Sequence, residues 1–245
     1  MSIWGKLIGG AAGFALGGPM GAIIGILVGG SFDRGNKNFL NKNNISQQQK
    51  KNIFAFSIII LSAKIAKADG QVTKEEILAF KDKFNIPNNE IKEVSKIFNE
   101  AKKSTIGFKQ IADQVGELFN DNKILLEELL NNLFYIAESD GKISIDEIEI
   151  LKSISKSFNL DEKDFQSIFH ARLNDKESDP YKVLKVNRTD SNLLIRKKWI
   201  QFNKEHHPDN LIAKGMPQEF IDLATKELSL INIAYDKIKT QRGIS

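Results

Sequence analysis

Three regions of this chain differ in how apolar and polar residues alternate. Residues 7–32 carry no charged side chain. From Ile53 to about residue 175, apolar residues return every three or four positions, the spacing of helices that bury one face. Residues 178–245 repeat that spacing between polar turns. We therefore predict an all-α chain with a single N-terminal transmembrane helix, a central helical bundle and a C-terminal helical hairpin.

The uncharged run Leu7–Phe32 is long enough to cross a membrane. As a helix it would measure about 39 Å, more than the roughly 30 Å of a hydrocarbon core. The apolar core of a signal peptide is shorter, about 7–15 residues. We predict that residues 1–32 form a membrane anchor; a buried helix of a soluble protein is the alternative.

Glycine recurs at every fourth position of this run. That spacing places the glycines on one stripe of a helix, where the absence of side chains lets two membrane helices approach closely. We predict a homodimer formed through the stripe, with packing against another membrane protein as the alternative. Pro19 lies within the stripe and can kink the helix. The stripe residues are Gly9, Gly13, Gly17, Gly21, Gly25 and Gly29.

Charge is unevenly distributed along the rest of the chain. Residues 33–52 are basic, the central region is acidic and residues 178–245 are basic again. Only Lys6 precedes the uncharged run, whereas five basic residues follow it before Ile53. Because basic flanks stay in the cytoplasm, we expect a single-pass protein of the inner membrane with a short N-terminus outside. Residues 33–52 then form a juxtamembrane linker in contact with lipid.

The central region, residues 53–175, contains an internal repeat. The segment "AKADGQVTKEEI" (residues 66–77) is similar to "AESDGKISIDEI" (residues 137–148). In each copy an Asp-Gly ends one helix, and a capping box opens the next. Thr73 pairs with Glu76 in the first box, and Ser144 pairs with Glu147 in the second. The alternative is a metal site made by the acidic residues of both copies, Asp69, Glu76, Asp140 and Glu147.

This repeat resembles the TerB-like helical domain. The resemblance implies a helical bundle that carries acidic residues near these turns, with a metal-binding or partner-binding role in some members. It supports a second hypothesis for the whole chain, a membrane-bound stress-sensing or metal-binding scaffold that acts through the central domain.

The composition narrows the possible chemistry. The chain has no cysteine and three histidines, so thiolate zinc sites, iron–sulfur clusters and cysteine nucleophiles are excluded. We find no serine, aspartate and histidine constellation and expect no cofactor and no enzyme activity. The basic regions contain acidic residues and lack interleaved aromatic residues, which argues against a nucleic-acid partner.

The C-terminal region predicts two long antiparallel helices. Caps in "TDS" open a helix from Asn192 to about His206, with Leu194, Ile195, Trp199 and Phe202 expected to face inward. A further helix is expected over residues 217–239, after a long loop over residues 210–218. Its expected inward residues are Phe220, Leu223, Ala224, Leu228, Ile231, Ala234, Tyr235 and Ile238.

The tripeptide His207-Pro208-Asp209 stands between these helices. Proline disfavours helical geometry at the residue before it, so the helix must stop at His207. A polar tip projected from a helical hairpin is suited to recognition. Adjacent helix residues do not face one point, so His206 and His207 are not expected to share a metal.

The short helix at "DPYKVL", the basic helix, the tripeptide and the final helix with Ala-Tyr resemble a J domain over residues 178–240. With its anchor and TerB-like centre, the whole chain resembles membrane-anchored J-domain co-chaperones. The resemblance implies that the domain, residues 178–245, docks on a DnaK-type ATPase chaperone and favours ATP hydrolysis. Ile200 and Gln201 stand where two further basic residues are usual, which would weaken or narrow partner choice. The implied partner-binding residues are His207, Pro208, Asp209, Arg196, Lys197, Lys198 and Lys204.

Overall fold

The computed structural model describes residues 3–6, 46–67, 80–82, 84–103, 107–138, 143–173 and 177–243. The first helices are α1 (Ile3–Lys6), α3 (Gln47–Ala66), α5 (Ile91–Lys103), α6 (Phe108–Leu118), α7 (Lys123–Ala137), α8 (Ile145–Ser157) and α9 (Glu162–Arg172). They are followed by α10 (Pro180–Val183), α11 (Asn192–Glu205), α12 (Pro208–Ala213), the 3-10 helix η3 (Gln218–Phe220) and α13 (Ile221–Arg242). The regular structure of these residues is helical, which confirms the predicted all-α class.

Several predictions fall outside the described residues. The membrane span over residues 7–32 and its glycine stripe lie outside them, and so do Asp69, Thr73, Glu76 and Asp140. Within the described part of the chain, no helix combines the length and the apolar character that a membrane crossing requires.

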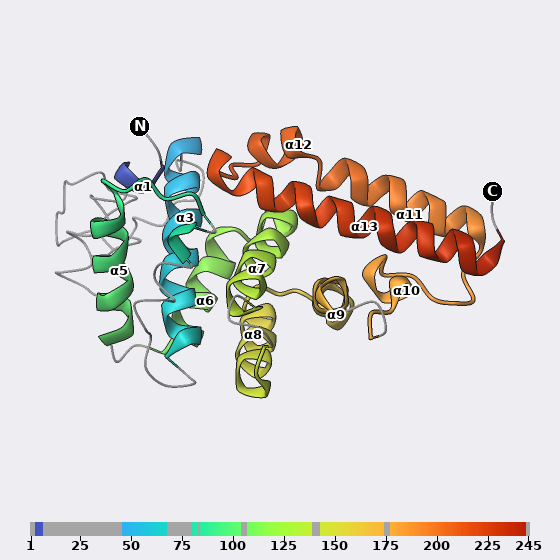
Figure 1. Ribbon diagram of the computed structural model, residues 1–245, viewed down its shortest axis with the longest axis horizontal. Helices are drawn as coiled ribbons and strands as arrows, with labels where there is room; N and C mark the ends of the chain where they lie inside the picture. Colours follow the sequence, from blue (N-terminus) through green and yellow to red (C-terminus); the bar gives the residue numbers. More distant parts are fainter. Residues whose placement is uncertain are drawn as a thin grey trace.

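Helix α3 is the centre of the first core. Ser46 caps its start: the Ser46 Oγ accepts from the Gln49 backbone N–H (3.2 Å), and the Gln49 side chain accepts from the Ser46 N–H (2.8 Å). From Ile53 to Ile65 every residue is buried, as expected of a helix that is apolar on all sides and surrounded by others. Helices α5, α6 and α7 pack around it (Figure 1).

The second predicted capping box is confirmed. The Ser144 Oγ accepts from the Glu147 N–H (3.2 Å), while the Glu147 carboxylate accepts from the Ser144 N–H (2.8 Å) and opens α8. Glu147 is therefore committed to the helix start. Within the described residues no group of three or more His, Cys, Asp or Glu side chains could hold a metal ion.

The predicted C-terminal hairpin is present. Helices α11 and α13 run side by side as the long arm of the molecule (Figure 1). Trp199 stacks on Tyr235 with ring centroids 4.4 Å apart, and the Trp199 Nε1–H donates to the Asn232 side chain (2.7 Å). The buried core of this arm is Tyr181, Val183, Leu184, Val186, Ile195, Phe202, Ile231, Ala234 and Ile238.

Two expectations for this hairpin are wrong. Leu194 was expected to face inward but is 39% exposed, because the buried stripe of α11 runs through Ile195 and Phe202 instead. The expected loop over residues 210–218 contains most of the short helix α12 and the start of η3. Pro208 ends α11 and at the same time supplies the first residue of α12, a position where proline is favoured.

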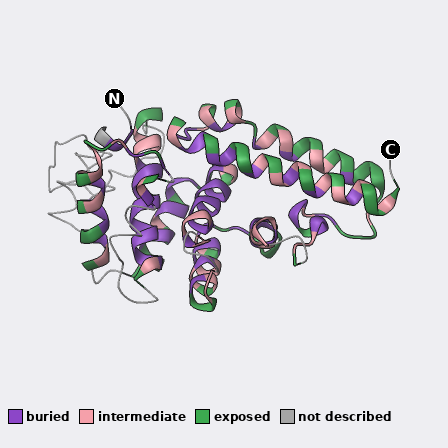
Figure 2. Ribbon diagram, in the orientation of Figure 1, coloured by how far each residue is buried: buried purple, intermediate pink, exposed green. Residues whose placement is uncertain are grey.

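The end of the hairpin that bears α12 belongs to the core of the central helices. The Phe220 ring lies 5.2 Å from Phe54 and 5.0 Å from Phe84, centroid to centroid. Burial is continuous across the junction between α12, α13, α3 and α7 (Figure 2). The hairpin residues in this core are Leu211, Met216, Phe220, Ile221, Leu223 and Ala224.

Candidate functional site

The His207-Pro208-Asp209 tripeptide lies at the start of α12, where the chain turns out of α11. His207 is the N-cap residue, and its Nδ1 accepts from the Asp209 backbone N–H (3.3 Å). The His207 and Asp209 side chains are 57% and 90% exposed. Asn210 closes the turn by donating to the backbone carbonyl of Glu205 (2.7 Å). Both predicted polar groups are therefore presented to solvent on a turn that hydrogen bonds between side chains and backbone hold in shape.

One face of α11 leads to this turn. At 100° per residue, Arg196, Lys197 and Lys204 fall on the same side of the helix as Leu193 and Ile200. The three basic residues are exposed. Leu193 is 79% exposed and Ile200 is 50% exposed. The open face therefore mixes positive charge with aliphatic surface and ends at His207.

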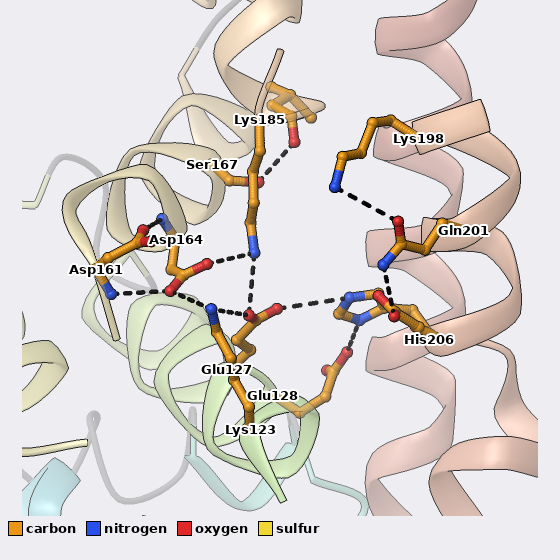
Figure 3. Close-up of polar contacts among 12 residues, drawn as sticks. Lys123, Glu127, Glu128, Asp161, Asp164, Ser167, Lys185, Lys198, Gln201 and His206 are labelled. Atoms are coloured by element: carbon orange, nitrogen blue, oxygen red, sulfur yellow. Dashed lines mark hydrogen bonds and ion pairs between the residues drawn. The ribbon is translucent and has the colours of Figure 1, made fainter. Parts of the chain in front are cut away.

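Lys198 differs from the other predicted basic residues. It lies toward the central helices, where its Nζ donates to the Gln201 side chain at 3.4 Å (Figure 3). A cavity of about 640 Å³ opens between α11 and the starts of α3 and α7, and Lys198 lines it together with Lys50 and Lys214. The structure thus separates Lys198 from the open face that holds Arg196, Lys197 and Lys204.

Beneath the turn, a cluster of charged side chains joins the hairpin to α7 and α9 (Figure 3). Lys185, just after α10, lies 3.0 Å from Glu127 and 2.8 Å from Asp164. Lys123 contacts the same Asp164 at 2.8 Å. Burial alone would raise the pKa of Asp164, but the charges and hydrogen bonds of Lys185 and Lys123 outweigh it and lower that pKa to about 2.

His206 belongs to this cluster and not to the exposed turn. Its Nδ1 donates to the Glu128 carboxylate (2.7 Å), and its Nε2 lies 3.7 Å from Glu127. Burial would lower the pKa of His206, yet the hydrogen bond and the charges of Glu128 and Glu127 outweigh it and raise that pKa. For Glu127, burial outweighs Lys185 and His206, and its pKa is raised.

A second buried contact ties α9 to α13. The Arg172 guanidinium pairs with Glu227 of α13 and with Glu138 (2.9 Å), and it donates to the Asn131 backbone and side-chain oxygens at 3.0 and 2.7 Å. Arg172 fills most of its hydrogen-bonding capacity inside the protein. The hairpin is therefore fixed to the central helices by charge pairs as well as by apolar packing.

The sequence did not single out this junction. Glu127 and Glu128 stand in the otherwise apolar stretch "ILLEELL", and two adjacent acids within a buried helix are a signal that they have partners. Their partners lie far away in sequence, at Lys185 and His206. Among the predicted site residues, Arg196, Lys197 and Lys204 are exposed on α11, and His207 and Asp209 are exposed on the turn that follows it.

Comparisons with known proteins agree with this architecture. Residues 55–170 match the family of tellurite resistance protein TerB, and residues 1–39 match the co-chaperone DjlA transmembrane domain. Co-chaperone protein DjlA of Photobacterium profundum is 26% identical over 98% of this chain and 99% of its own length. Co-chaperone protein DjlA of Coxiella burnetii is 28% identical over 98% of both chains. No solved structure matches the chain.

The fold and these matches define a helical protein in which a transmembrane domain precedes a TerB-type domain, and the TerB-type domain carries a C-terminal hairpin. Over nearly its whole length the chain is similar to co-chaperone proteins named DjlA.

Proposed function

We propose that this chain is a membrane-anchored, non-enzymatic co-chaperone whose J domain stimulates ATP hydrolysis by a cytoplasmic DnaK-type chaperone. The observation that carries the proposal is the exposed His207-Pro208-Asp209 turn at the end of the basic face of α11. The names of its DjlA relatives support the co-chaperone role.

The turn acts by binding and not by chemistry on ATP. Stimulating the ATPase requires that the J domain bind the hydrolysis-competent arrangement of its partner more tightly than the resting one. Arg196, Lys197 and Lys204 steer the encounter with an acidic partner surface, while His207 and Asp209 make the contacts that depend on the partner's state. We assign partner binding to these five residues and to Pro208, which fixes the turn. Lys198, which lines the cavity of about 640 Å³ between α11 and the central helices, contributes at the edge of the partner-binding surface.

A substitution of Ile200 tests both the proposed function and whether the open face of α11 binds its partner partly through apolar contact. The resemblance implies that the absence of a basic residue at position 200 weakens or narrows partner choice. Because Ile200 is half exposed among basic residues, we propose instead that it packs on an apolar patch within the acidic partner surface. Ile200→Lys then raises the concentration of the chain that half-saturates stimulation by roughly tenfold, because about 1.4 kcal/mol of apolar burial is lost. The measurement is ATP hydrolysis by the host's DnaK-type chaperone against increasing full-length chain in detergent micelles.

A purely electrostatic face predicts the opposite sign for this variant. A lysine at position 200 would add a positive charge beside Arg196 and Lys204 and lower the half-saturating concentration, which would contradict an apolar role for Ile200. Ile233→Lys on α13 is the matched control, because Ile233 is also exposed but does not lie on α11. If the wild-type chain leaves hydrolysis unchanged, the proposed function itself is wrong.

We propose a single crossing of the inner membrane by residues 7–32, with the central and J domains in the cytoplasm. A chain that crosses once places Trp4 and the central domain on opposite sides. In the structure, however, Trp4 is buried against the central core, 5.5 Å from the Phe220 ring and 6.1 Å from that of Phe84. The proposed membrane form therefore requires Trp4 to leave this aromatic cluster.

Fluorescence of Trp4 distinguishes these two placements. In a Trp199→Phe chain, Trp4 is the remaining tryptophan. We expect brominated lipid in vesicles to quench its emission strongly, because tryptophan favours the membrane–water interface. Emission unaffected by the brominated lipid, as for a tryptophan kept within the protein core, would contradict the single crossing.

We also propose that the glycine stripe, Gly9 to Gly29, makes the membrane form a homodimer. Energy transfer between differently labelled chains in sparsely loaded vesicles tests this. Transfer no greater than that of randomly mixed monomers would contradict it.

A further inference from the structure

The helix that carries the tripeptide depends on the central domain for its shape. Helix α12 spans only Pro208–Ala213. Isolated helices shorter than about 12 residues are marginal in water, so packing must hold this one in place. Its Leu211 is fully buried in the core built around α3 and α7, together with Met216 just beyond the helix. The geometry of the exposed turn is thus set by residues outside the hairpin.

The central domain holds α12 at both ends. At the far end, the Asn122 side chain donates to the Lys214 carbonyl (3.2 Å), and the Gln47 side chain donates to the Ala213 carbonyl (3.3 Å). These bonds satisfy carbonyl groups that a helix end leaves free. At the near end, His206 donates to Glu128 of α7 (2.7 Å). The tripeptide begins at the very next residue.

Charge balance favours a protonated imidazole at the near contact. Glu127 and Glu128 of α7 face the His206 ring, as does Lys185, which follows α10. Asp164 lies behind Lys185. Lys123 completes the cluster, in which two lysines meet three carboxylates (Figure 3). A charged His206 cancels the remaining negative charge. Glu227 of α13 lines a separate small cavity together with Glu127, Glu128 and His206, and it is already paired with Arg172.

We propose that His206 is a positioning residue: its buried contact with Glu128 clamps the His-Pro-Asp turn to the TerB-type domain and fixes the direction in which the turn meets its partner. The clamp is a property of the fold. Its effect on the partner rests on the proposed function.

The clamp has a defined dependence on pH. Glu128 and Glu127 raise the pKa of His206 above its ordinary value, against the effect of burial. The stabilisation is therefore complete below about pH 6.5, the pKa of an unfolded-state histidine, and is lost as pH rises through the raised pKa of the folded state. The raised pKa of Glu127, which burial causes, acts in the same direction because its charged form is disfavoured in the fold.

Hydrogen exchange of α12 tests the clamp without any partner. The reporters are the backbone amides of Leu211, Lys214 and Met216, which donate to carbonyls within the turn. In the full-length chain in micelles, we expect their protection factors to fall roughly tenfold as pH rises through the His206 pKa. His206→Gln should show the low protection at every pH, and Glu128→Gln should move the midpoint to lower pH.

His170→Gln is the control. Burial and then Lys182 lower the pKa of His170, the opposite direction from that of His206, so this variant should follow the pH dependence of the wild type. Protection in His206→Gln equal to that of the wild type at pH 6.5 would overturn the proposal. For partner action, His206→Gln should raise the half-saturating concentration several-fold at pH 6.5 and little at pH 8.5. A normal pH transition in α12 without any stimulation of ATP hydrolysis would contradict the proposed function and leave the clamp standing.

Discussion

Lys185→Met is expected to lower the free energy of unfolding by about 3 kcal/mol at pH 7. Lys185 is the cation that Glu127 and Asp164 share, at 3.0 and 2.8 Å. Methionine keeps the length of the side chain but leaves Glu127 and Asp164 in a buried site with one fewer positive charge. Removing one partner of a buried ion pair costs more than the pair itself contributes, because the remaining charge stays desolvated. Denaturant unfolding monitored by circular dichroism measures the loss.

The matched control for this variant is Lys163→Met. Lys163 is an exposed residue of α9, so this variant also removes one positive charge but takes it from the surface. The two variants should also differ in their dependence on pH. Because the pKa of Asp164 is lowered to about 2, its contribution is complete above the unfolded value of about 3.9 and is lost as pH falls toward 2. Equal unfolding midpoints for Lys185→Met and Lys163→Met at pH 7 would contradict a joining role for the cluster.

His207→Gln is expected to remove nearly all stimulation of the partner's ATPase while leaving the fold unchanged. Its side chain is 57% exposed and contacts the neighbouring Asp209. A central residue of a binding site costs 2 kcal/mol or more when altered, which corresponds to roughly a 30-fold weaker interaction. Glutamine keeps a hydrogen-bonding side chain but changes its reach and shape.

Two measurements separate binding from folding in this variant. The thermal unfolding midpoint of His207→Gln should match that of the wild type. Lys185→Met should unfold at a lower temperature but, below that temperature, should still stimulate ATP hydrolysis by the partner. A His207→Gln chain that stimulates hydrolysis as the wild type does would show that the turn is not the partner site.

The helices were largely predictable because their signals are local. Apolar spacing predicted α11 and α13, and the Ser144–Glu147 capping box predicted the start of α8. Proline after His207 correctly predicted the end of α11. The same proline also begins α12, and sequence reasoning assigned that segment to a loop because six residues are too few for a periodic pattern to appear.

The junction could not be predicted from local signals. The His206–Glu128 pair joins residues 78 positions apart. Phe220, Leu223 and Ala224 fit the spacing of a hairpin helix, but they bury their side chains in the central core because α12 bends the chain toward α3. Apolar spacing tells which face of a helix is buried and does not tell which neighbour covers it. Leu194 is exposed for a related reason, since α13 covers only a narrow stripe of α11.

Single-turnover hydrolysis of ATP prebound to the host's DnaK-type chaperone measures whether the exposed turn stimulates that ATPase. The full-length chain in vesicles would be added at rising concentration, wild type beside His207→Gln. We expect the wild type to accelerate the single turnover in a saturable manner and His207→Gln to leave it unchanged. Equal rates with and without the wild-type chain would contradict the claim that the exposed turn makes this protein a co-chaperone of a DnaK-type ATPase.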